Sequence, residues 1–271
     1  MTATSTTPAT STTAVAANRG RFVWHELLTN DLEDARNFYT KVVGWTTQKW
    51  DGANKDYIMW MAGETPIGGL MPMPEDAKKM GTPPSWIAYV EVPDVDQTLR
   101  DAERLGGRVI EPARAMPQVG RFAVLRDPQG AVISVITSEG PVTPETDPRP
   151  LEFSWHELLT TDQPGAIAFY QKLFGWVPKD EFEMEDGKGP YKMFGRDRFT
   201  YGGVMKKPVG LSAPSHWLNY ITVKDTADAA VERATKLGAK LMIGPMDVPG
   251  GDRIAELVDP QGAMFAVHSK K

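Results

Sequence analysis

The sequence contains two closely similar stretches, "DLEDARNFYTKVVGW" at residues 31–45 and "DQPGAIAFYQKLFGW" at residues 162–176. Each begins with an aspartate, carries a Phe-Tyr pair in its middle and ends on Gly-Trp. Aspartate is a favoured N-cap of helices, and glycine is favoured just beyond a helix C-terminus. Each stretch therefore predicts one short helix that begins after the aspartate and ends at the glycine.

The same spacing recurs along the chain and indicates an internal duplication. "FVWHELLTND" at 22–31 matches "FSWHELLTTD" at 153–162, which puts His25 and His156 131 positions apart (156 − 25 = 131). "DPQGA" at 127–131 returns at 259–263, 132 positions later (259 − 127 = 132). Repeats that keep their phase over this length indicate two homologous domains. We expect a disordered tail at 1–20, a first domain at 21–138, an extended linker at 139–150 and a second domain at 151–269.

Strand patterns surround each predicted helix and set the fold class. In the first half, strands are predicted at 21–30, 45–50, 56–62, 66–73, 85–94, 108–113, 121–126 and 131–137, with a second helix after Asp94. The order βαβββ thus occurs twice in each half. So few helices can cover only one face of each sheet, so we expect an α+β protein whose cup-shaped sheets each keep one free face. A free, concave face is suited to binding a small molecule.

Composition excludes several classes of function. The net charge is -5 and no basic block is present, so nucleic acid and anionic lipid are not expected partners. No apolar run is long enough to cross a bilayer. The absence of cysteine removes disulfides, thiolate metal sites and thiol nucleophiles, and it fits a reducing cytoplasm. We therefore expect a cytoplasmic monomer or homodimer that binds a small molecule.

The ordered motifs resemble those of the vicinal oxygen chelate superfamily, which includes glyoxalase I, bleomycin-resistance proteins and extradiol dioxygenases. The resemblance rests on the two Asp-to-Gly-Trp stretches and the two "DPQGA" turns, and it covers residues 21–269. The tandem halves are especially similar to Cfp30B-type glyoxalase-like proteins. This resemblance implies that two βαβββ units form each cup. It also implies either binding of a small organic molecule or glyoxalase-type lyase, isomerase or metal-dependent chemistry on a small carbonyl compound.

The resemblance also says where metal ligands should lie. In metal-binding members they stand seven residues before the helix-starting aspartate and seven after the aspartate of the "DPxG" turn. The corresponding positions here are Trp24, Ile87, Ser134, Trp155, Leu218 and Ala266. None is a good ligand for a divalent metal, and Ser134 is only a weak one. We therefore expect no metal and no cofactor.

The two histidines lie one residue beyond these positions, and successive residues of a strand point to opposite faces. We expect Phe22, Trp24, Glu26 and Leu28 to line the cup, and Val23, His25 and Leu27 to face the helices. His25 and His156 are interpreted as hydrogen-bonded residues between sheet and helix. A ligand role for them would require a register slip or bulge in both halves.

Two glutamate–tyrosine pairs are the candidate catalytic residues. A carboxyl group in an apolar cup has a raised pKa and could act as a general acid or base, while a phenol could stabilise an enolate. The pairs are Glu26 with Tyr89 and Glu157 with Tyr220. The alternative is that each glutamate only ties strands together, through its tyrosine or through Arg121 or Arg253. The expected ligand-binding residues are Trp24, Ile87, Ser134, Trp155, Leu218 and His268. We favour metal-independent binding, with a lyase or isomerase as the alternative and with one or both cups active.

Overall fold

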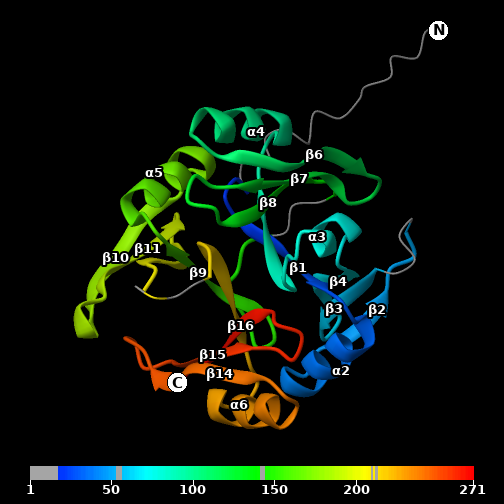
Figure 1. Ribbon diagram of the computed structural model, residues 1–271, viewed down its shortest axis with the longest axis vertical. Helices are drawn as coiled ribbons and strands as arrows, with labels where there is room; N and C mark the ends of the chain where they lie inside the picture. The colour runs from blue at the N-terminus through cyan, green and yellow to red at the C-terminus, as the bar shows by residue number, and fades with distance from the viewer. Residues whose placement is uncertain (1–17, 53–56, 141–143, 209, 211–212) are drawn as a thin grey trace, which may run out of the picture.

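The computed structural model describes residues 18–52, 57–140, 144–208, 210 and 213–271. The tail predicted at 1–20 lies outside these ranges, except for residues 18–20, which form a turn. Sixteen strands in the described ranges form two eight-stranded sheets, and Figure 1 shows both sheets curved around a common centre. The strands form two sheets and the helices pack against these sheets, so the molecule is an α+β protein.

The first sheet uses residues 22–138 only. Its elements are β1 (Phe22–Thr29), α2 (Leu32–Val42), β2 (Thr46–Lys49), β3 (Ile58–Ala62), β4 (Thr65–Pro72), α3 (Glu75–Lys79), β5 (Ser85–Glu91), α4 (Val95–Arg104), β6 (Arg108–Met116), β7 (Gly120–Arg126) and β8 (Val132–Ser138). The strand order is β2-β3-β4-β1-β5-β8-β7-β6, with β1 parallel to β4 and antiparallel to β5.

The second sheet repeats this plan. Its elements are β9 (Phe153–Thr160), α5 (Gln163–Phe174), β10 (Val177–Met184), the short 3₁₀ turn η1 (Glu185–Gly187), β11 (Gly189–Arg196), β12 (Phe199–Lys206), β13 (His216–Thr222), α6 (Ala227–Lys236), β14 (Lys240–Asp247), β15 (Arg253–Val258) and β16 (Met264–Ser269). The strand order is β10-β11-β12-β9-β13-β16-β15-β14, which matches the first sheet position by position. The prediction of four βαβββ units in two tandem domains is therefore confirmed.

Helix starts follow the sequence signals in three of the four units. Asp31, Asp94 and Asp162 each accept a backbone N–H at the start of their helix through the carboxylate. The fourth helix differs, because α6 is capped by the hydroxyl of Thr226, while Asp225 pairs with Arg233. The short helix α3 was not predicted, since it buries none of its residues and so leaves no hydrophobic pattern.

The core lies between the two domains. One buried cluster joins α2 and β1 to α6 and β16, and a second joins α4 and β8 to α5 and β9. Accordingly α2 lies beside α6 and α4 beside α5 (Figure 1). Each domain thus completes the hydrophobic core of the other.

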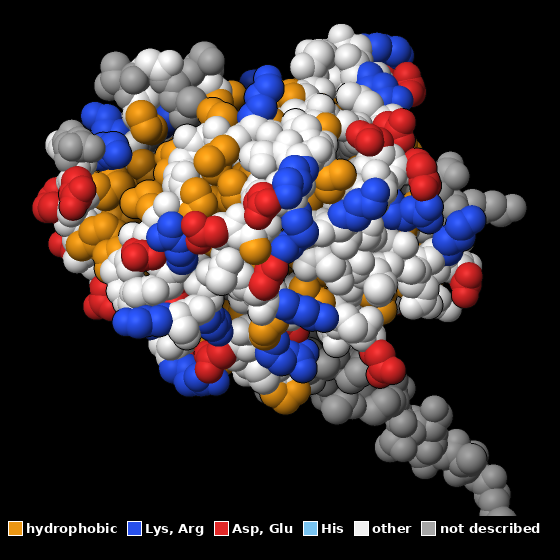
Figure 2. Space-filling view, turned by 90° about the horizontal axis from the view of Figure 1, so that it is seen from below, with side chains coloured by type: hydrophobic (Ala, Val, Ile, Leu, Met, Phe, Trp, Pro, Cys, Tyr) orange, Lys and Arg blue, Asp and Glu red, His pale blue; other side chains and the backbone are white. Residues whose placement is uncertain are grey.

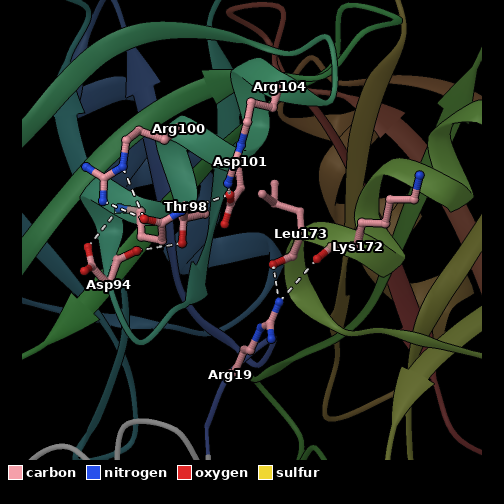
Figure 3. A network of polar contacts seen from close by, with 9 residues as sticks. Arg19, Asp94, Thr98, Arg100, Asp101, Arg104, Lys172 and Leu173 are labelled. Atoms are coloured by element: carbon pink, nitrogen blue, oxygen red, sulfur yellow. Dashed lines mark hydrogen bonds and ion pairs between the residues drawn. The ribbon is translucent and has the colours of Figure 1, made fainter.

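The repeated motifs supply reciprocal hydrogen bonds across this junction. The phenol of Tyr39 donates to Asp259 at 3.0 Å, and that of Tyr170 donates to Asp127 at 3.0 Å. Trp45 donates to the carbonyl of Leu151 at 2.7 Å. In the same way, Arg19 donates to the carbonyls of Lys172 and Leu173 at the C-terminus of α5, close to α4 (Figure 3). The Phe-Tyr and "DPQGA" motifs therefore fasten one domain to the other.

Charges of both signs are mixed on the surface. Figure 2 shows Lys, Arg, Asp and Glu side chains interspersed on the side that carries α6 and β14, with hydrophobic side chains between them. Within the described residues, no helix is both long and apolar enough to span a membrane.

Candidate functional site

Each sheet has a free face that points away from the shared core. On β5 and β13 the core takes Val90, Val92, Ile221 and Val223, so the alternate residues Tyr89 and Tyr220 face the other way. We call the first free face the surface formed by Trp24, Glu26, Ile87, Tyr89, Phe122, Ser134 and Ile136. The second free face comprises Trp155, Glu157, Leu218, Tyr220, Glu256, Ala266 and His268. Each carries its own small apolar cluster, separate from the main cores.

On the first free face, a carboxyl group is held by two phenols. Tyr89 donates to Glu26 at 2.7 Å, and Tyr57 also hydrogen-bonds to Glu26. The indole of Trp24 in turn donates to the Tyr57 oxygen at 2.9 Å. Only 8% of Glu26 is exposed, whereas Trp24, Ile87 and Tyr57 are partly exposed. Solvent therefore reaches the aromatic rim, and the carboxyl group lies just beneath it.

The second free face repeats this arrangement. Trp155 donates to the Tyr191 oxygen at 2.8 Å, and Tyr191 donates to Glu157 at 2.8 Å. Glu157 is 5% exposed. An additional carboxyl group, Glu256 on β15, accepts from Tyr220 at 3.3 Å. The second face thus holds two buried carboxyl groups that share the phenol of Tyr220, whereas the other buried carboxyl group of the first face, Glu91, bonds to Ser138.

Glycine doublets make room for the phenols that lie over the sheets. A Cβ on Gly69 would lie 1.9 Å from the Tyr57 oxygen, and one on Gly203 would lie 2.1 Å from Cε1 of Tyr191. Their neighbours Gly68 and Gly202 lie equally close to the carbonyls of His25 and His156. These strands therefore need glycine where another backbone or a ring approaches closely.

Burial decides the acid–base character of both sites. It raises the pKa of Glu26, although the hydrogen bonds from Tyr89 and Tyr57 partly oppose this. Burial, together with the charge of Glu256, raises the pKa of Glu157 to about 8. Burial also raises the pKa of Glu256. Glu157 is therefore able to hold a proton at neutral pH, which an ordinary glutamate is not.

The expected binding residues lie on these faces in different degrees of exposure. Trp24, Ile87 and Trp155 are partly exposed, while Ser134 and Leu218 are fully buried. His268 lies at the end of β16 on the same face as Ala266. Its Nδ1 is 2.8 Å from the hydroxyl of Ser154, and its Nε2 is 2.8 Å from Asp252. His268 is thus fixed at the rim and does not contact Glu157 through these bonds.

His25 and His156 meet at the junction of the two domains. Their Nε2 atoms are 2.8 Å apart, and His156 Nδ1 lies 3.0 Å from the carbonyl oxygen of Tyr201. A carbonyl oxygen can only accept, so Nδ1 of His156 carries the proton and its Nε2 accepts from Nε2–H of His25. Burial lowers the pKa of both rings, that of His156 to about 3. Both histidines face the core as predicted, but their partner is each other and not a helix.

One expected position on β1 is wrong. Phe22 was expected in the cup, yet its ring stacks on His156 with centroids 3.6 Å apart on the core side. Val23 instead packs with Trp24 against the first free face. The register of β1 against β5 shifts between Phe22 and Trp24, so a bulge reverses the alternation there.

The arginine alternative for the glutamates is also wrong. Arg121 pairs with Asp96, and Arg253 pairs with Asp228 and Asp247. The tyrosine alternative holds for Glu26, whose partner is Tyr89. It also holds for Glu157, because Tyr220 hydrogen-bonds to it as well as to Glu256, and Tyr191 is a second phenol partner of Glu157.

Three site residues were missed by the sequence analysis: Tyr57, Tyr191 and Glu256. The two tyrosines occupy matching places in the repeat, on or just before the second strand of a hairpin (191 − 57 = 134). This match was a usable signal, but it needed the hairpin register to show that the rings reach the glutamates. Glu256 has no acidic counterpart in the first half, so the repeat gave no reason to select it.

The donor atoms on these faces do not fit a family-type metal centre. The six positions expected from the resemblance carry indole, aliphatic and hydroxyl side chains, and the indole N–H of Trp24 is used by Tyr57. Among the described residues, no group of three or more His, Asp or Glu side chains is placed to hold a metal ion. No chemical step is therefore derived through a metal.

A cavity of about 360 Å³ lies elsewhere, between α5 and strands β10 to β12. Its walls include Ile167, Trp176 and Phe194, and Lys179 and Glu181 also line it. None of the candidate residues of the free faces lines this cavity. It is thus separate from the glutamate sites.

The paired sheets, the free faces and the repeated motifs together define a superfamily. The family model described as Glyoxalase/Bleomycin resistance protein/Dioxygenase superfamily matches residues 21–135 and again 153–267. The chain belongs to this family and carries two copies of its domain.

Particular relatives span nearly the whole chain. "Putative glyoxylase CFP32" of Mycobacterium tuberculosis is 32% identical over 246 residues, covering 90% of this chain and 92% of its own. "Anthracycline biosynthesis protein DauV" of Streptomyces sp. is 29% identical over 259 residues, covering 92% of both chains.

Solved structures share the fold at much lower identity. The 2,3-dioxygenase LapB from Pseudomonas sp. KL28 superposes with a TM-score of 0.65 at 13% identity, covering 93% of both chains. The Mn(II)-bound glyoxalase from Novosphingobium aromaticivorans gives 0.60 at 16% identity, over 93% of this chain and 82% of that one.

Proposed function

We propose that the protein binds small organic molecules on its free faces without a metal, with the aromatic rim contacting the ligand and the buried carboxyl group fixing its orientation. The observation that carries this proposal is the repeated Trp–Tyr–Glu chain of hydrogen bonds, Trp24 to Tyr57 to Glu26 and Trp155 to Tyr191 to Glu157. A mostly apolar surface with few, well-placed polar groups is typical of small-molecule sites. The expected setting is the cytoplasm, as a monomer or homodimer.

The ligand is expected to be partly aromatic and to carry a carbonyl or hydroxyl group. Trp24 and Trp155 offer partly exposed rings for stacking. A protonated glutamate can donate to a carbonyl oxygen, and an ionised one can accept from a hydroxyl. The names of the relatives point in the same direction, since glyoxylase refers to carbonyl chemistry and anthracyclines are aromatic compounds.

A second candidate function is proton transfer beside a carbonyl group, as in a lyase or isomerase. The raised pKa of Glu26 and of Glu157 favours it, because a general acid or base is most effective when its pKa lies near the working pH. Tyr89 and Tyr220 would then act as the phenols that stabilise enolate charge. In this case Glu26, Tyr89, Glu157 and Tyr220 are the catalytic residues.

Glu26→Gln separates the two candidates. The substitution keeps volume and most hydrogen bonding but removes the proton acceptor. If Glu26 is catalytic, turnover of an identified substrate falls by a factor of about 100 to 10,000, with little change in affinity. If Glu26 orients a ligand, affinity or stability shifts by about 1–3 kcal/mol and no turnover is present.

The measurement combines calorimetric ligand binding with turnover assays on ligands found by thermal-shift screening of chelator-treated protein. Glu157→Gln tests the second face in the same way. Glu103→Gln, an exposed glutamate on α4, is the matched control. The assignment of the free faces fails if neither Glu26→Gln nor Glu157→Gln alters turnover, affinity or thermal stability.

A further inference from the structure

The two free faces differ at one buried position although they come from a repeated sequence. Glu256 on β15 corresponds to Val124 on β7 (256 − 132 = 124). Both pair with the last strand of their domain at equivalent places, Glu256 with Ala266 and Val124 with Ser134. The second free face therefore has a carboxyl group where the first has an aliphatic side chain. By contrast, Glu157 of the second face corresponds to Glu26 of the first.

Tyr220 links the two carboxyl groups of the second face. Its phenol donates to Glu256 at 3.3 Å and also hydrogen-bonds to Glu157. Glu157 is 5% exposed and Glu256 is 8% exposed, so water screens their repulsion poorly. Lys188, just after η1, lies near enough to Glu256 to act on it electrostatically.

Aromatic rings surround this carboxyl pair. Tyr191 lies over Gly203 and donates to Glu157, and Phe182 stacks on Tyr191 with centroids 5.2 Å apart. Trp155 is partly exposed and donates to Tyr191. Ring faces carry negative electrostatic potential and attract cations, and carboxylates do so more strongly.

A buried hydroxyl on the same face lacks a partner. Thr222 lies two residues beyond Tyr220 on β13, is 1% exposed, and its Oγ1 makes no hydrogen bond. Its counterpart in the first domain is Glu91 (222 − 131 = 91), which bonds to the backbone and hydroxyl of Ser138. Buried polar atoms normally have partners, and Ser134 Oγ on the first free face is buried without one in the same way, so each face has a hydroxyl that a ligand could bond.

We infer that the second free face binds an organic ammonium group, whose positive charge favours the ionised form of its partners Glu157 and Glu256, and that the first free face takes an uncharged ligand. This inference rests on the proposed function and adds the charge of the ligand. An ammonium group brings up to three N–H donors and one positive charge to a place that offers two carboxyl groups, a free hydroxyl and aromatic rings. On the first face Glu26 is bonded by both phenols, and the other buried carboxyl group, Glu91, is bonded by the backbone and hydroxyl of Ser138.

The test uses benzylamine and benzyl alcohol, which have similar shape but differ in charge at neutral pH. Binding is followed by the indole N–H signals of Trp155 and Trp24 in two-dimensional NMR, assigned with Trp155→Phe and Trp24→Phe. We expect benzylamine to shift the Trp155 signal with a Kd about tenfold or more below that of benzyl alcohol. The Trp24 signal should show no such preference.

Glu256→Gln and Glu256→Val, the latter copying Val124, should each abolish this preference, while Glu103→Gln should keep it. Having two variants guards against one that fails to fold, which the NMR spectrum itself reveals. Equal binding of both probes at Trp155 would overturn the inference and leave the proposed function standing. Absence of any shift at either tryptophan would contradict both. A shift of the Trp155 signal by Mg²⁺ alone, equal to that by benzylamine, would also overturn it, because the site would then not select an organic cation.

Discussion

At the scale of single residues, burial shifts the pKa values of Glu157 and His156 in the directions that favour their neutral forms. Burial disfavours the charged form of both, so it raises the pKa of Glu157 and lowers that of His156. Neutral glutamate and neutral histidine can each still hydrogen-bond, which is what Tyr191 and His25 require of them. Burial of Glu157 costs stability as the pH rises, whereas burial of His156 costs stability as the pH falls.

Glu157→Gln should make the protein relatively more stable at alkaline pH. The folded-state pKa of Glu157 is raised to about 8, so the folded state keeps a proton that the unfolded state loses above its ordinary value of about 4.5. Stability is therefore lost as pH rises from 4.5 to 8, by at most about 1.4 kcal/mol per pH unit. The substitution removes this slope, and urea unfolding at pH 5 and pH 8 measures it.

Glu103→Gln, on the exposed side of α4, is the control for that comparison and should leave the pH profile unchanged. A profile of Glu157→Gln that parallels the original protein between pH 5 and pH 8 would mean that Glu157 ionises normally.

His25→Ala should act on stability and not on ligand binding. It leaves the buried Nε2 of His156 without a donor and removes the stacking of His25 on Phe153. The loss of about 1–3 kcal/mol lowers the melting temperature by roughly 2–12 °C. Because the folded-state pKa of His25 is lowered, its cost appears as pH falls below about 6.5, and the variant should lose less stability there than the original protein.

Differential scanning calorimetry at pH 7 and pH 5 checks this, with Glu103→Gln on the exposed side of α4 as the comparison. Weaker ligand binding with an unchanged melting temperature would show that His25 contributes to a binding site.

At the scale of elements, the alternation of side chains between the two faces of a strand predicted most residues of the free faces. The prediction failed at one position, where β1 contains a bulge. Glu26, Tyr89 and Tyr220 lie where a simple two-residue period puts them. Phe22 does not, because the bulge beside it depends on the pairing of β1 with β5 and leaves no local signal in the sequence. In the same way, the hydrogen bonds of Tyr57 to Glu26 and of Tyr191 to Glu157 depend on which strands neighbour β1 and β9.

Gly203→Ala should displace Tyr191 from the second free face. The added Cβ would lie 2.1 Å from Cε1 of Tyr191. The tyrosine ring therefore cannot keep its place over β12. Tyr191 then loses its bonds to Trp155 and Glu157, at a cost of about 1–3 kcal/mol. Chemical denaturation measures the loss, and the indole signal of Trp155 reports the displaced phenol.

A double-mutant cycle identifies the cause. In a Tyr191→Ala background the ring is gone, so Gly203→Ala should cost clearly less than it does alone. An equal cost in both backgrounds would place the need for glycine in the backbone and not in the ring.

At the scale of the whole molecule, the duplication explains both what the sequence predicted and what it missed. The helix caps, the strand periods and the 131-residue offset were enough for four βαβββ units in two domains (162 − 31 = 131). They could not show that each domain packs its core against the other, because contacts such as Tyr39 with Asp259 join residues far apart in the chain. The partner of His25 was missed for the same reason.

Duplication also left two free faces that can diverge separately. The Trp–Tyr–Glu chain of hydrogen bonds is present in both domains, whereas Glu256 occurs only in the second, where the first has Val124. The first-strand positions where the resemblance implies a metal ligand carry Trp24 and Trp155. The central claim is therefore that binding on these faces needs no metal.

Elemental analysis by inductively coupled plasma mass spectrometry tests this claim most directly, on protein purified without chelator or added metal and passed through gel filtration. The account predicts far less than one Zn, Ni, Fe or Mn per chain, together with unchanged ligand affinity after treatment with EDTA, because the side chains on both free faces offer no suitable donor set. One metal ion per domain that survives gel filtration, with ligand binding lost when EDTA removes it, would contradict the account.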